Sequence, residues 1–429
     1  MTGQHVADLH DPGSLVAADA AALLPSAALA GAQVRACAEQ LASWAEFDRP
    51  RALVVIGATA AVDAGLLSAL IGERAPAPVV AATALPGWVG PLDIVVVLAS
   101  AVDDMLSAEA AALAARRGAR VVVRASADGP VAAAAGGALL DPLLAVPEGL
   151  AGTARLAVLA SVASAAGLYP RPDFVEAAEQ LDAMAMACHP STDLFINPGL
   201  TLAEHLATGT PLLIGTDPIA DAIAAHGCRS LAGLAGCAAA WLGSGQAAGS
   251  PPVLARATGP GGSGGGVFYD PYDGGAQPGQ QISTVLVVGP SAYSAAGPLT
   301  GSGLLPPDAL PAFGSGPSAA GRSPLAAALE AALPKAMCIG PDELPTTATT
   351  ARPEPGAGAA VLRQRDAFTW TVAMLSRIDF AAVYLGLLTG ARPPMDSPDG
   401  LGRPGRAVTH RPPTSGPAAW TESESGSWS

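Results

Sequence analysis

The stretch PLDIVVVLASAVDDMLSAEAAALAARRGARVVV, residues Pro91–Val123, decides the fold. Ile94–Leu98 is a short, uncharged run of aliphatic residues, as a strand buried on both faces requires. Ser107 is a natural N-cap for the alanine-rich helix that follows, and Gly118 can take the left-handed conformation that ends it. Arg120–Arg124 then reads as a second strand. Strand, helix and strand in this order predict a parallel βαβ unit with a right-handed crossover.

The loop Ala99–Ser107 joins the first of these strands to the helix. In parallel sheets, small anionic ligands lie beyond the carboxyl ends of the strands, against a helix N-terminus. We therefore expect a ligand site at this loop.

The alternation of strands and helices continues on both sides of the unit. Ser14–Phe47 predicts two helices that are separated at Pro25. A second series of elements follows residue 173, with Asp217–His226 and Ser230–Trp241 as two further helices. This pattern predicts an α/β protein with two tandem doubly wound parallel sheets and flanking helices.

The predicted domain organisation follows from shifts in composition. Gly- and Pro-rich stretches are typical of linkers and mobile insertions, and tails with few apolar residues cannot offset the entropy of ordering. We expect a disordered N-terminus at 1–13, a first domain at 14–168, a second domain at 174–390 with Gly/Pro-rich insertions at about 243–266 and 289–322, and a disordered tail at 391–429.

The composition argues against several classes of function. The net charge of −14 and the lack of a basic stripe argue against nucleic acid. Charged residues interrupt the apolar stretch Val131–Leu168, so we expect no membrane span, and the N-terminus shows no signal peptide. The five cysteines match no zinc or CxxC spacing and predict free thiols. We expect a cytoplasmic protein with no cofactor and no metal.

A dinucleotide-dependent dehydrogenase is the competing class of enzyme. That class needs the spacing G-x-G-x-x-G after the first strand and an acidic residue at the end of the second. Ile56–Gly65 lacks the glycine spacing, and Val79–Ala82 ends without an acid. A dehydrogenase is therefore a much less favoured interpretation of this sequence than the one that follows.

Four segments carry a resemblance to a known family, together with Asn197 and Ala203. They are AALAARRGARVVV (Ala110–Val123), VPEGLAGTARLAVL (Val146–Leu159), PLLIGTDPIADAIA (Pro211–Ala224) and RIDFAAVYLGLLTG (Arg377–Gly390). In these segments the chain resembles the bifunctional glucose-6-phosphate/mannose-6-phosphate isomerases, which are built from two sugar-isomerase (SIS) domains. It is most similar to their divergent actinobacterial branch, the TobH-like proteins. The resemblance covers roughly residues 14–390 and implies tandem SIS domains.

The resemblance also implies where a sugar phosphate binds. The family's first phosphate loop follows strand one, where Gly57 and Thr59 remain here. Its second loop follows the next long strand, where Ser100 keeps one hydroxyl. Arg155 stands at a charged position of the family and can contact phosphate or hydroxyl groups.

The catalytic groups are less complete. Aldose–ketose isomerisation needs a base, usually a carboxylate, and an acid that opens the ring, usually histidine. The family supplies both from a segment that matches Cys228–Gln246, which contains no Glu, Asp or His here. Glu204 and His205 are weak catalytic candidates, because adjacent helical residues point about 100° apart. We expect His189 and His226 to be solvated.

Two functions therefore remain open. One is a sugar-phosphate aldose–ketose isomerase acting on glucose 6-phosphate or mannose 6-phosphate. The other is a catalytically inactive SIS protein that binds a sugar phosphate or a protein partner and regulates. The expected partner is a small sugar phosphate, with no nucleic acid and no membrane, and a homodimer is left open.

Overall fold

The computed structural model describes residues 7–41, 46–73, 75–101, 103–134, 138–141, 144, 146–258, 282–290, 324–345 and 367–391. All of these belong to one compact unit within Met1–Met395. The predictions for residues 259–281, 291–323 and 392–429 lie outside the described residues. The division into domains at 14–168 and 174–390 stays a prediction.

The first half is built around a parallel sheet. Its elements are α1 (Pro12–Ala18), α2 (Leu23–Ala28), α3 (Ala30–Leu41), β1 (Leu53–Ile56), α4 (Ala60–Ile71), β2 (Val79–Ala82), β3 (Ile94–Leu98), α5 (Met105–Arg116), β4 (Arg120–Arg124), α6 (Pro130–Ala134), β5 (Ala138–Leu140), the 3-10 helix η1 (Glu148–Leu150) and α7 (Gly152–Ala165). The strand order is β2-β1-β3-β4-β5, and every pairing is parallel.

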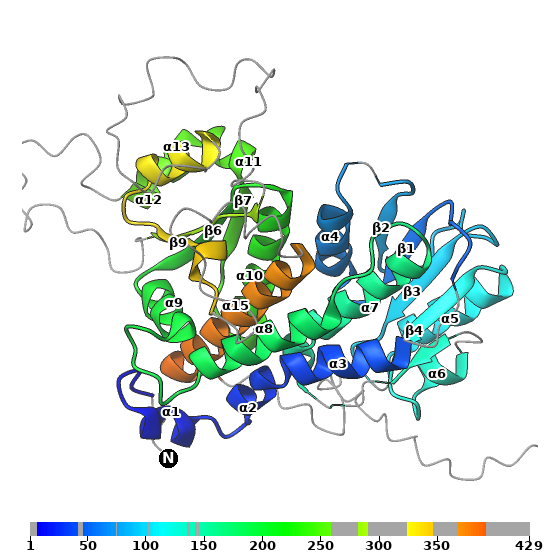
Figure 1. Cartoon of the computed structure of the whole chain (residues 1–429), viewed down its shortest axis with the longest axis horizontal. Coiled ribbons are helices and arrows are strands. Elements are labelled where there is room, and N and C mark those ends of the chain that lie inside the picture. The colour runs from blue at the N-terminus through cyan, green and yellow to red at the C-terminus, as the bar shows by residue number, and fades with distance from the viewer. Residues whose placement is uncertain are drawn as a thin grey trace, which may run out of the picture. The chain divides into compact units, whose positions relative to one another are not determined.

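The predicted βαβ unit is confirmed. Strands β3 and β4 are adjacent and parallel, with Val96 opposite Val122. All five residues of β3 are buried. Successive side chains of a strand point to opposite faces of the sheet, and both faces are covered here. Val96 packs in a core with α4 and α7, whereas Val95 and Val97 pack against α5 and α6. Helices therefore cover both faces of the sheet (Figure 1).

The N-terminal segment forms three helices where the sequence predicts two. Pro25 does not separate helices; it is the third residue of α2, where a missing N–H breaks no helical hydrogen bond. The carboxylate of Asp19 accepts hydrogen bonds from the amides of Leu23 and Leu24 at 2.8 and 2.9 Å, which starts that helix. Part of the N-terminus predicted as disordered is packed, since Ala7 is buried and its amide donates to the carbonyl of Leu387.

The second half carries the other parallel sheet, in the order β7-β6-β8-β9. Its elements are α8 (Phe174–Ala187), α9 (Pro198–Ala207), β6 (Thr210–Gly215), α10 (Pro218–Ala235), β7 (Ala240–Gly243), α11 (Ser244–Ala248), α12 (Pro251–Thr258), β8 (Ile282–Val287), α13 (Pro324–Ala332), β9 (Met337–Ile339), the 3-10 helix η4 (Pro341–Glu343) and α15 (Ala367–Thr389). Helices α11, α12 and α13 cover one face, and α9, α10 and α15 cover the other.

Two sequence predictions for this half are wrong. The two helices predicted over Asp217–Trp241 are one helix, α10, followed by strand β7. Gly227 does not break α10: it lets the helix approach the sheet, because a Cβ there would lie 2.5 Å from the side chain of Leu213. The stretch 243–258, predicted as a mobile insertion, folds as α11 and α12 because Ala247 and Ala257 bury against the second sheet.

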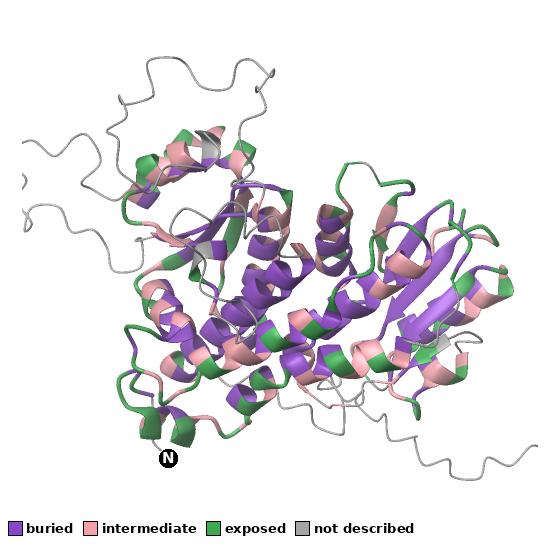
Figure 2. Cartoon of the chain, viewed as in Figure 1, coloured by how far each residue is buried: buried purple, intermediate pink, exposed green. Residues whose placement is uncertain are grey.

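Helix α15 lies at the centre of the core. It packs against α8, α9 and α10, and nearly every residue from Phe368 to Leu387 is buried, as the purple ribbon in Figure 2 shows. Among the described residues it is the one helix long and apolar enough to cross a membrane, and 94% of its apolar window is buried inside the protein. Such burial on all sides is typical of a core helix.

Candidate functional site

The carboxyl edge of the first sheet brings two loops together. Gly57 follows β1 with a φ of +151°, and a Cβ at this position would collide with the carbonyl oxygen of Leu98 at the end of β3. Only glycine permits so close an approach of two backbones. Gly57 and Ser100 therefore lie on neighbouring loops at one edge of the sheet.

Thr59 links this edge to a buried carboxylate. Its hydroxyl donates a hydrogen bond of 2.5 Å to Oδ2 of Asp63, in the first turn of α4. Asp63 is completely buried. The Thr59 hydroxyl proton is thus committed to Asp63, and its oxygen lone pairs remain for another donor.

The start of α5 is capped by Asp104, not by Ser107 as the sequence suggests. The Asp104 carboxylate accepts hydrogen bonds from the Ser107 amide at 3.0 Å, the Ser107 hydroxyl at 2.7 Å and the Ser100 amide at 3.4 Å. Asp104 is the cap because its carboxylate, three residues before the Ser107 amide, reaches that amide directly and its negative charge complements the helix dipole. These donors are the groups that a phosphate at this helix N-terminus would use.

Arg155 is fully buried and does not face the open edge. Its Nε donates to Asp63 Oδ2 at 2.9 Å, and its Nη1 donates to Glu148 Oε1 at 2.5 Å. Burial lowers the pKa of Arg155, but Asp63 and Glu148 more than offset this, so the pKa is raised overall. Burial raises the pKa of Glu148, against the opposing effect of Arg155. Thr59, Asp63, Arg155 and Glu148 form one hydrogen-bonded chain.

A second buried cluster lies where α10 meets α15. His226 Nε2 donates to Asp379 Oδ1 at 2.8 Å, and the Ser230 hydroxyl donates to the same oxygen at 2.6 Å. The prediction that His226 is solvated is wrong, since the side chain of His226 is fully buried. The reason is that α10 is continuous at this residue and turns it toward α15. His189 is exposed, as predicted.

The two clusters meet at the first residue of α7. A Cβ on Gly152 would lie 2.8 Å from His226 Cε1 and 3.8 Å from Arg155 Nη2. Arg229 of α10 is half-buried here, and its pKa is lowered by burial and by the charge of Arg155. The polar network therefore ties helices α4, α7, α10 and α15 together between the two sheets.

Ser230, His226 and Asp379 are the residue types of a hydrolytic triad, but their geometry does not match one. In such a triad the carboxylate binds one imidazole nitrogen and the serine binds the other. Here the Asp379 carboxylate and the Ser230 hydroxyl both contact Nε2, while His226 Nδ1 is buried with no hydrogen-bond partner among the residues that the structure describes. Ser230 is also 1% exposed. The cluster is built to hold helices together rather than to attack a substrate.

The two weak catalytic candidates lie elsewhere, on α9. His205 Nε2 is 2.8 Å from the carbonyl oxygen of Thr284, so this nitrogen carries the proton and donates. Glu204 is exposed. Helix α9 packs on the second sheet and α15, whereas Gly57, Thr59, Ser100 and Arg155 belong to the first half (Figure 1). The structure does not gather all six predicted residues in one place.

The carboxyl edge of the second sheet carries an acidic pair that the sequence reading missed. Asp217 caps α10 by accepting from the Ala220 amide at 2.8 Å, and Asp221 follows one turn later. Burial and the charge of Asp217 raise the pKa of Asp221 to about 6. Gly243 permits this packing, since a Cβ there would lie 2.6 Å from Asp221 Oδ2.

Metal ligands and thiols add no further centre to the described residues. No three His, Cys, Asp or Glu side chains gather as a metal site within them. All five cysteines are free, as their spacing predicts. Cys188 is buried, and burial raises the pKa of its thiol to about 12.

Isolated acidic residues in apolar helices are the sequence signal that could have indicated the buried network. Asp63 is a lone charge within the apolar helix AAVDAGLLSALI, and Asp379 is a lone acid within the apolar stretch IDFAAVYLGLL. Charged residues are almost never fully buried unless they are paired. Such isolated acids in apolar helices therefore indicate a buried cationic or imidazole partner, although not which one.

The sequence matches no protein-family model and none of the curated proteins. Solved structures do share its fold. The C-terminal domain of glucosamine-fructose-6-phosphate aminotransferase from Francisella tularensis matches with a TM-score of 0.50 and 9% identity, over 86% of this chain and 96% of that one. A protein classed as a phosphosugar isomerase from Clostridium difficile matches with a TM-score of 0.50 and 8% identity, over 87% of this chain and 94% of that one.

Tagatose-6-phosphate ketose/aldose isomerase from Escherichia coli matches with a TM-score of 0.49 and 13% identity, over 90% of this chain and 93% of that one. The first two matches span both sheets of this protein. The chain therefore shares with these two structures an α/β fold of parallel sheets flanked by helices, the fold class that the sequence predicts.

Proposed function

We propose that this protein binds a sugar phosphate at the carboxyl edge of its first sheet and does not isomerise it. The proposal rests on the absence of Glu, Asp and His from the segment Cys228–Gln246. The resembling family takes its catalytic glutamate and histidine from that segment, which here has neither carboxylate nor imidazole. It forms the end of α10, strand β7 and the start of α11. General acid–base catalysis contributes about 100- to 10,000-fold per group, so the loss of both removes turnover.

The fold supports the binding half of the proposal, because the matched structures include proteins of sugar-phosphate chemistry. Within the edge, α4 begins without a side-chain cap, whereas Asp104 caps α5. Phosphate is therefore better placed at the start of α4, beside Gly57 and Thr59, with Ser100 on the adjoining loop. Arg155 acts in this proposal as a positioning residue, which holds Asp63 and through it Thr59.

A protein that binds without turnover acts as a regulator or sensor, and this is the role we infer in place of the glucose-6-phosphate/mannose-6-phosphate isomerase activity of the resembling family. A cytoplasmic location and a homodimer belong to the same proposal. Cell fractionation and sedimentation of the purified chain test those two points.

The test measures binding and turnover on the same purified chain. Glucose 6-phosphate, mannose 6-phosphate and fructose 6-phosphate are added in a thermal-shift assay, and isomerisation is followed in a coupled assay. Ala58→Asp places a negative charge on the exposed loop after β1 and is expected to abolish the stabilisation by ligand. Ser68→Asp adds the same charge on the exposed surface of α4, away from its first turn, and is expected to leave the stabilisation unchanged.

Each arm can overturn one half of the proposal. Stabilisation by none of the three sugar phosphates would refute binding. Robust conversion that is lost in His205→Ala would refute the absence of turnover and restore the isomerase function.

A further inference from the structure

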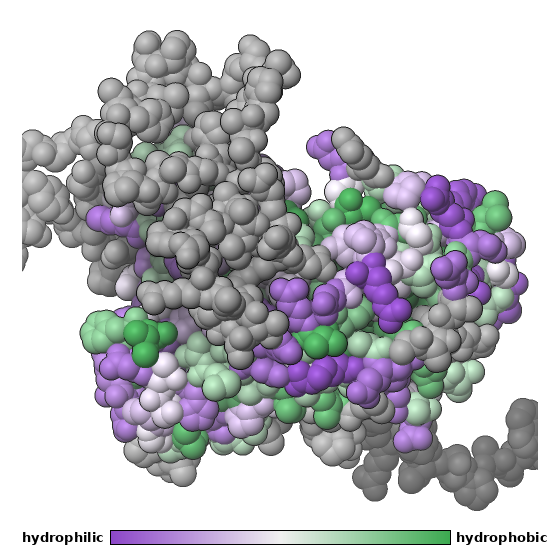
Figure 3. Space-filling model, in the orientation of Figure 1, coloured by the Kyte–Doolittle hydropathy of each residue, from purple (hydrophilic) through white to green (hydrophobic). Residues whose placement is uncertain are grey.

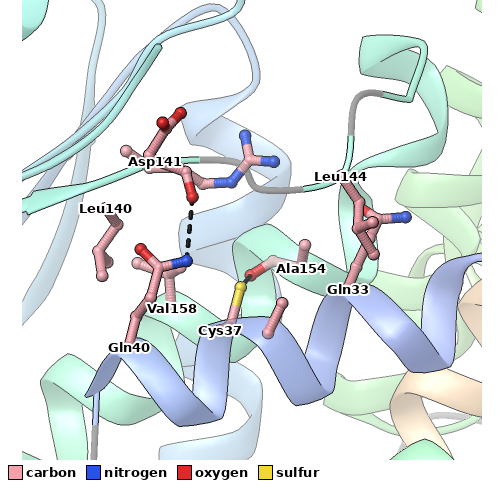
Figure 4. Close-up of a pocket in the computed structure, with 10 residues that line it drawn as sticks. Gln33, Cys37, Gln40, Leu140, Asp141, Leu144, Ala154 and Val158 are labelled. Atoms are coloured by element: carbon pink, nitrogen blue, oxygen red, sulfur yellow. Dashed lines mark hydrogen bonds between the residues drawn. The ribbon is translucent and has the colours of Figure 1, made fainter. Parts of the chain in front are cut away.

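A pocket of about 310 Å³, measured with its open mouth, lies between α3, α7 and the ends of β4 and β5. Figure 4 shows Gln33, Cys37 and Gln40 pointing toward it from one side of α3, as residues one and two turns apart do. Arg124, Asp141 and Ala154 also line it. It lies at the same carboxyl edge of the first sheet as the proposed sugar-phosphate site, but no residue of the loops 57–59 or 99–104 lines it, so the two sites have separate linings.

Arg124 is the unusual member of this lining. It is the last residue of β4, and only 5% of it is exposed. In the described part of the chain its guanidinium takes part in no hydrogen bond and in no ion pair, in contrast to Arg155, which has both. Burying a charged group without a partner has a free-energy penalty of several kcal/mol.

The protein's own charges do not neutralise Arg124. Burial is the largest influence on its pKa and lowers it, Glu148 opposes this from a distance, and Arg155 adds to the lowering. Glu148 and Asp63 are each already hydrogen-bonded to Arg155. Asp141 turns its backbone to the pocket, where its carbonyl accepts from Gln40 Nε2 at 3.0 Å. A guanidinium cannot escape the penalty by losing its proton, because its pKa lies far above neutral.

Gln33 is a second group without a partner among the described residues. It is 4% exposed, and neither its amide nitrogen nor its amide oxygen, both buried, has a hydrogen bond within that part of the chain. Buried side-chain amides in folded proteins are nearly always hydrogen-bonded, and each exception calls for an explanation. Arg124 and Gln33 together offer a pocket several N–H donors and one positive charge that nothing in the described chain uses.

We propose that this pocket is a binding site for a small oxyanion, a phosphate or a carboxylate group, held by Arg124 and Gln33. The planar guanidinium binds either group through two parallel N–H···O bonds, and the Gln33 amide adds a third donor. The pocket is small and open at its mouth, so it takes a single oxyanion group rather than a whole sugar. Cys37 lies beside the bound charge. Burial raises the pKa of its thiol, and the charge of Arg124 only partly opposes this.

The experiment titrates the full chain with sodium phosphate and, separately, sodium acetate, at constant ionic strength in an anion-poor buffer. Binding is measured by calorimetry and thermal shift. We expect the wild type to bind at least one of the two anions, and Arg124→Met to weaken that binding by a factor of about 10–100. Gln33→Leu weakens it less, and Arg116→Met, which removes an exposed arginine from α5, leaves it unchanged. The sugar-phosphate response that Ala58→Asp removes should persist in Arg124→Met.

Two further readouts separate a ligand arginine from a structural one. Without added anion, Arg124→Met should melt at the same temperature as the wild type or above it, because it removes an unpaired buried charge. The bound anion should also slow alkylation of Cys37, measured by mass spectrometry, but not that of Cys237. The proposal would be overturned if neither anion binds the wild type, or if Arg124→Met binds the anion as well as the wild type does. A large loss of stability in Arg124→Met without anion would overturn it too.

Discussion

Replacement of Arg155 by methionine tests the buried network most directly. Methionine keeps much of the apolar volume but removes the guanidinium that donates to Asp63 and Glu148. Asp63 has no exposed side-chain surface and the Glu148 side chain is 26% exposed, so at least one carboxylate is left buried without its partner. Breaking a buried ion pair on one side is destabilising by about 3–5 kcal/mol. This is a large part of the roughly 5–15 kcal/mol that holds a domain folded.

The matched control is Arg35→Met. Arg35 also makes two hydrogen bonds to one carboxylate, that of Asp182, but the two side chains are 45% and 46% exposed. The two residues belong to α3 and α8, and Figure 3 shows a band of hydrophilic side chains across the face on which these helices lie. Exposed ion pairs contribute about 0–1 kcal/mol. Free energies of unfolding from urea titrations should therefore differ between the two variants by about 2–5 kcal/mol.

A double variant identifies the origin of the loss. Asp63→Asn removes the charge that Arg155→Met leaves unpaired, so the double variant should be more stable than the sum of the two single losses predicts. A loss in Arg155→Met no larger than that in Arg35→Met would refute the reasoning. Strict additivity of Arg155→Met and Asp63→Asn would refute it as well.

Three further predictions concern packing, pH and the C-terminus. Gly152→Ala should destabilise by about 1–3 kcal/mol, since its methyl group would lie 2.8 Å from His226 Cε1, whereas Gly233→Ala, with open space on α10, should be neutral or stabilising in the same urea assay. Burial and a neighbouring aspartate raise the pKa of Asp221 from 3.8 to about 6, so the folded state holds a proton that the unfolded state releases. Stability should therefore fall as pH rises through this interval, and Asp221→Asn should remove that part of a melting-temperature profile. Truncation after Ala391 should leave the melting temperature nearly unchanged, because the residues removed have too little apolar content to offset roughly 1–2 kcal/mol of ordering entropy per residue.

The sequence by itself determined the elements whose signal is local. Ile94–Leu98 and Arg120–Arg124 are strands because short aliphatic runs suit a sheet covered on both faces, and the structure has them adjacent and parallel. Phe174–Ala187 is a helix whose start has a local cause, since the carboxylate of Asp173 caps its first turn. Where local signals competed, the sequence reading failed. The two helices expected at 217–226 and 230–241 are one continuous helix to Ala235, in which Gly227 allows contact with the sheet, and Asp104 rather than Ser107 caps α5.

Only the tertiary structure decided which polar groups meet. Arg155 is 92 residues from Asp63 in the sequence, and His226 is 153 residues from Asp379, yet each pair shares a hydrogen bond in the core. Periodicity identifies the buried side of a helix, but the partner of a buried charge depends on how helices from distant parts of the chain pack. For the same reason Arg155, which the sequence placed at the ligand edge, lies in the interior. Arg124, which no local pattern singled out, is left buried beside a pocket with no partner among the described residues.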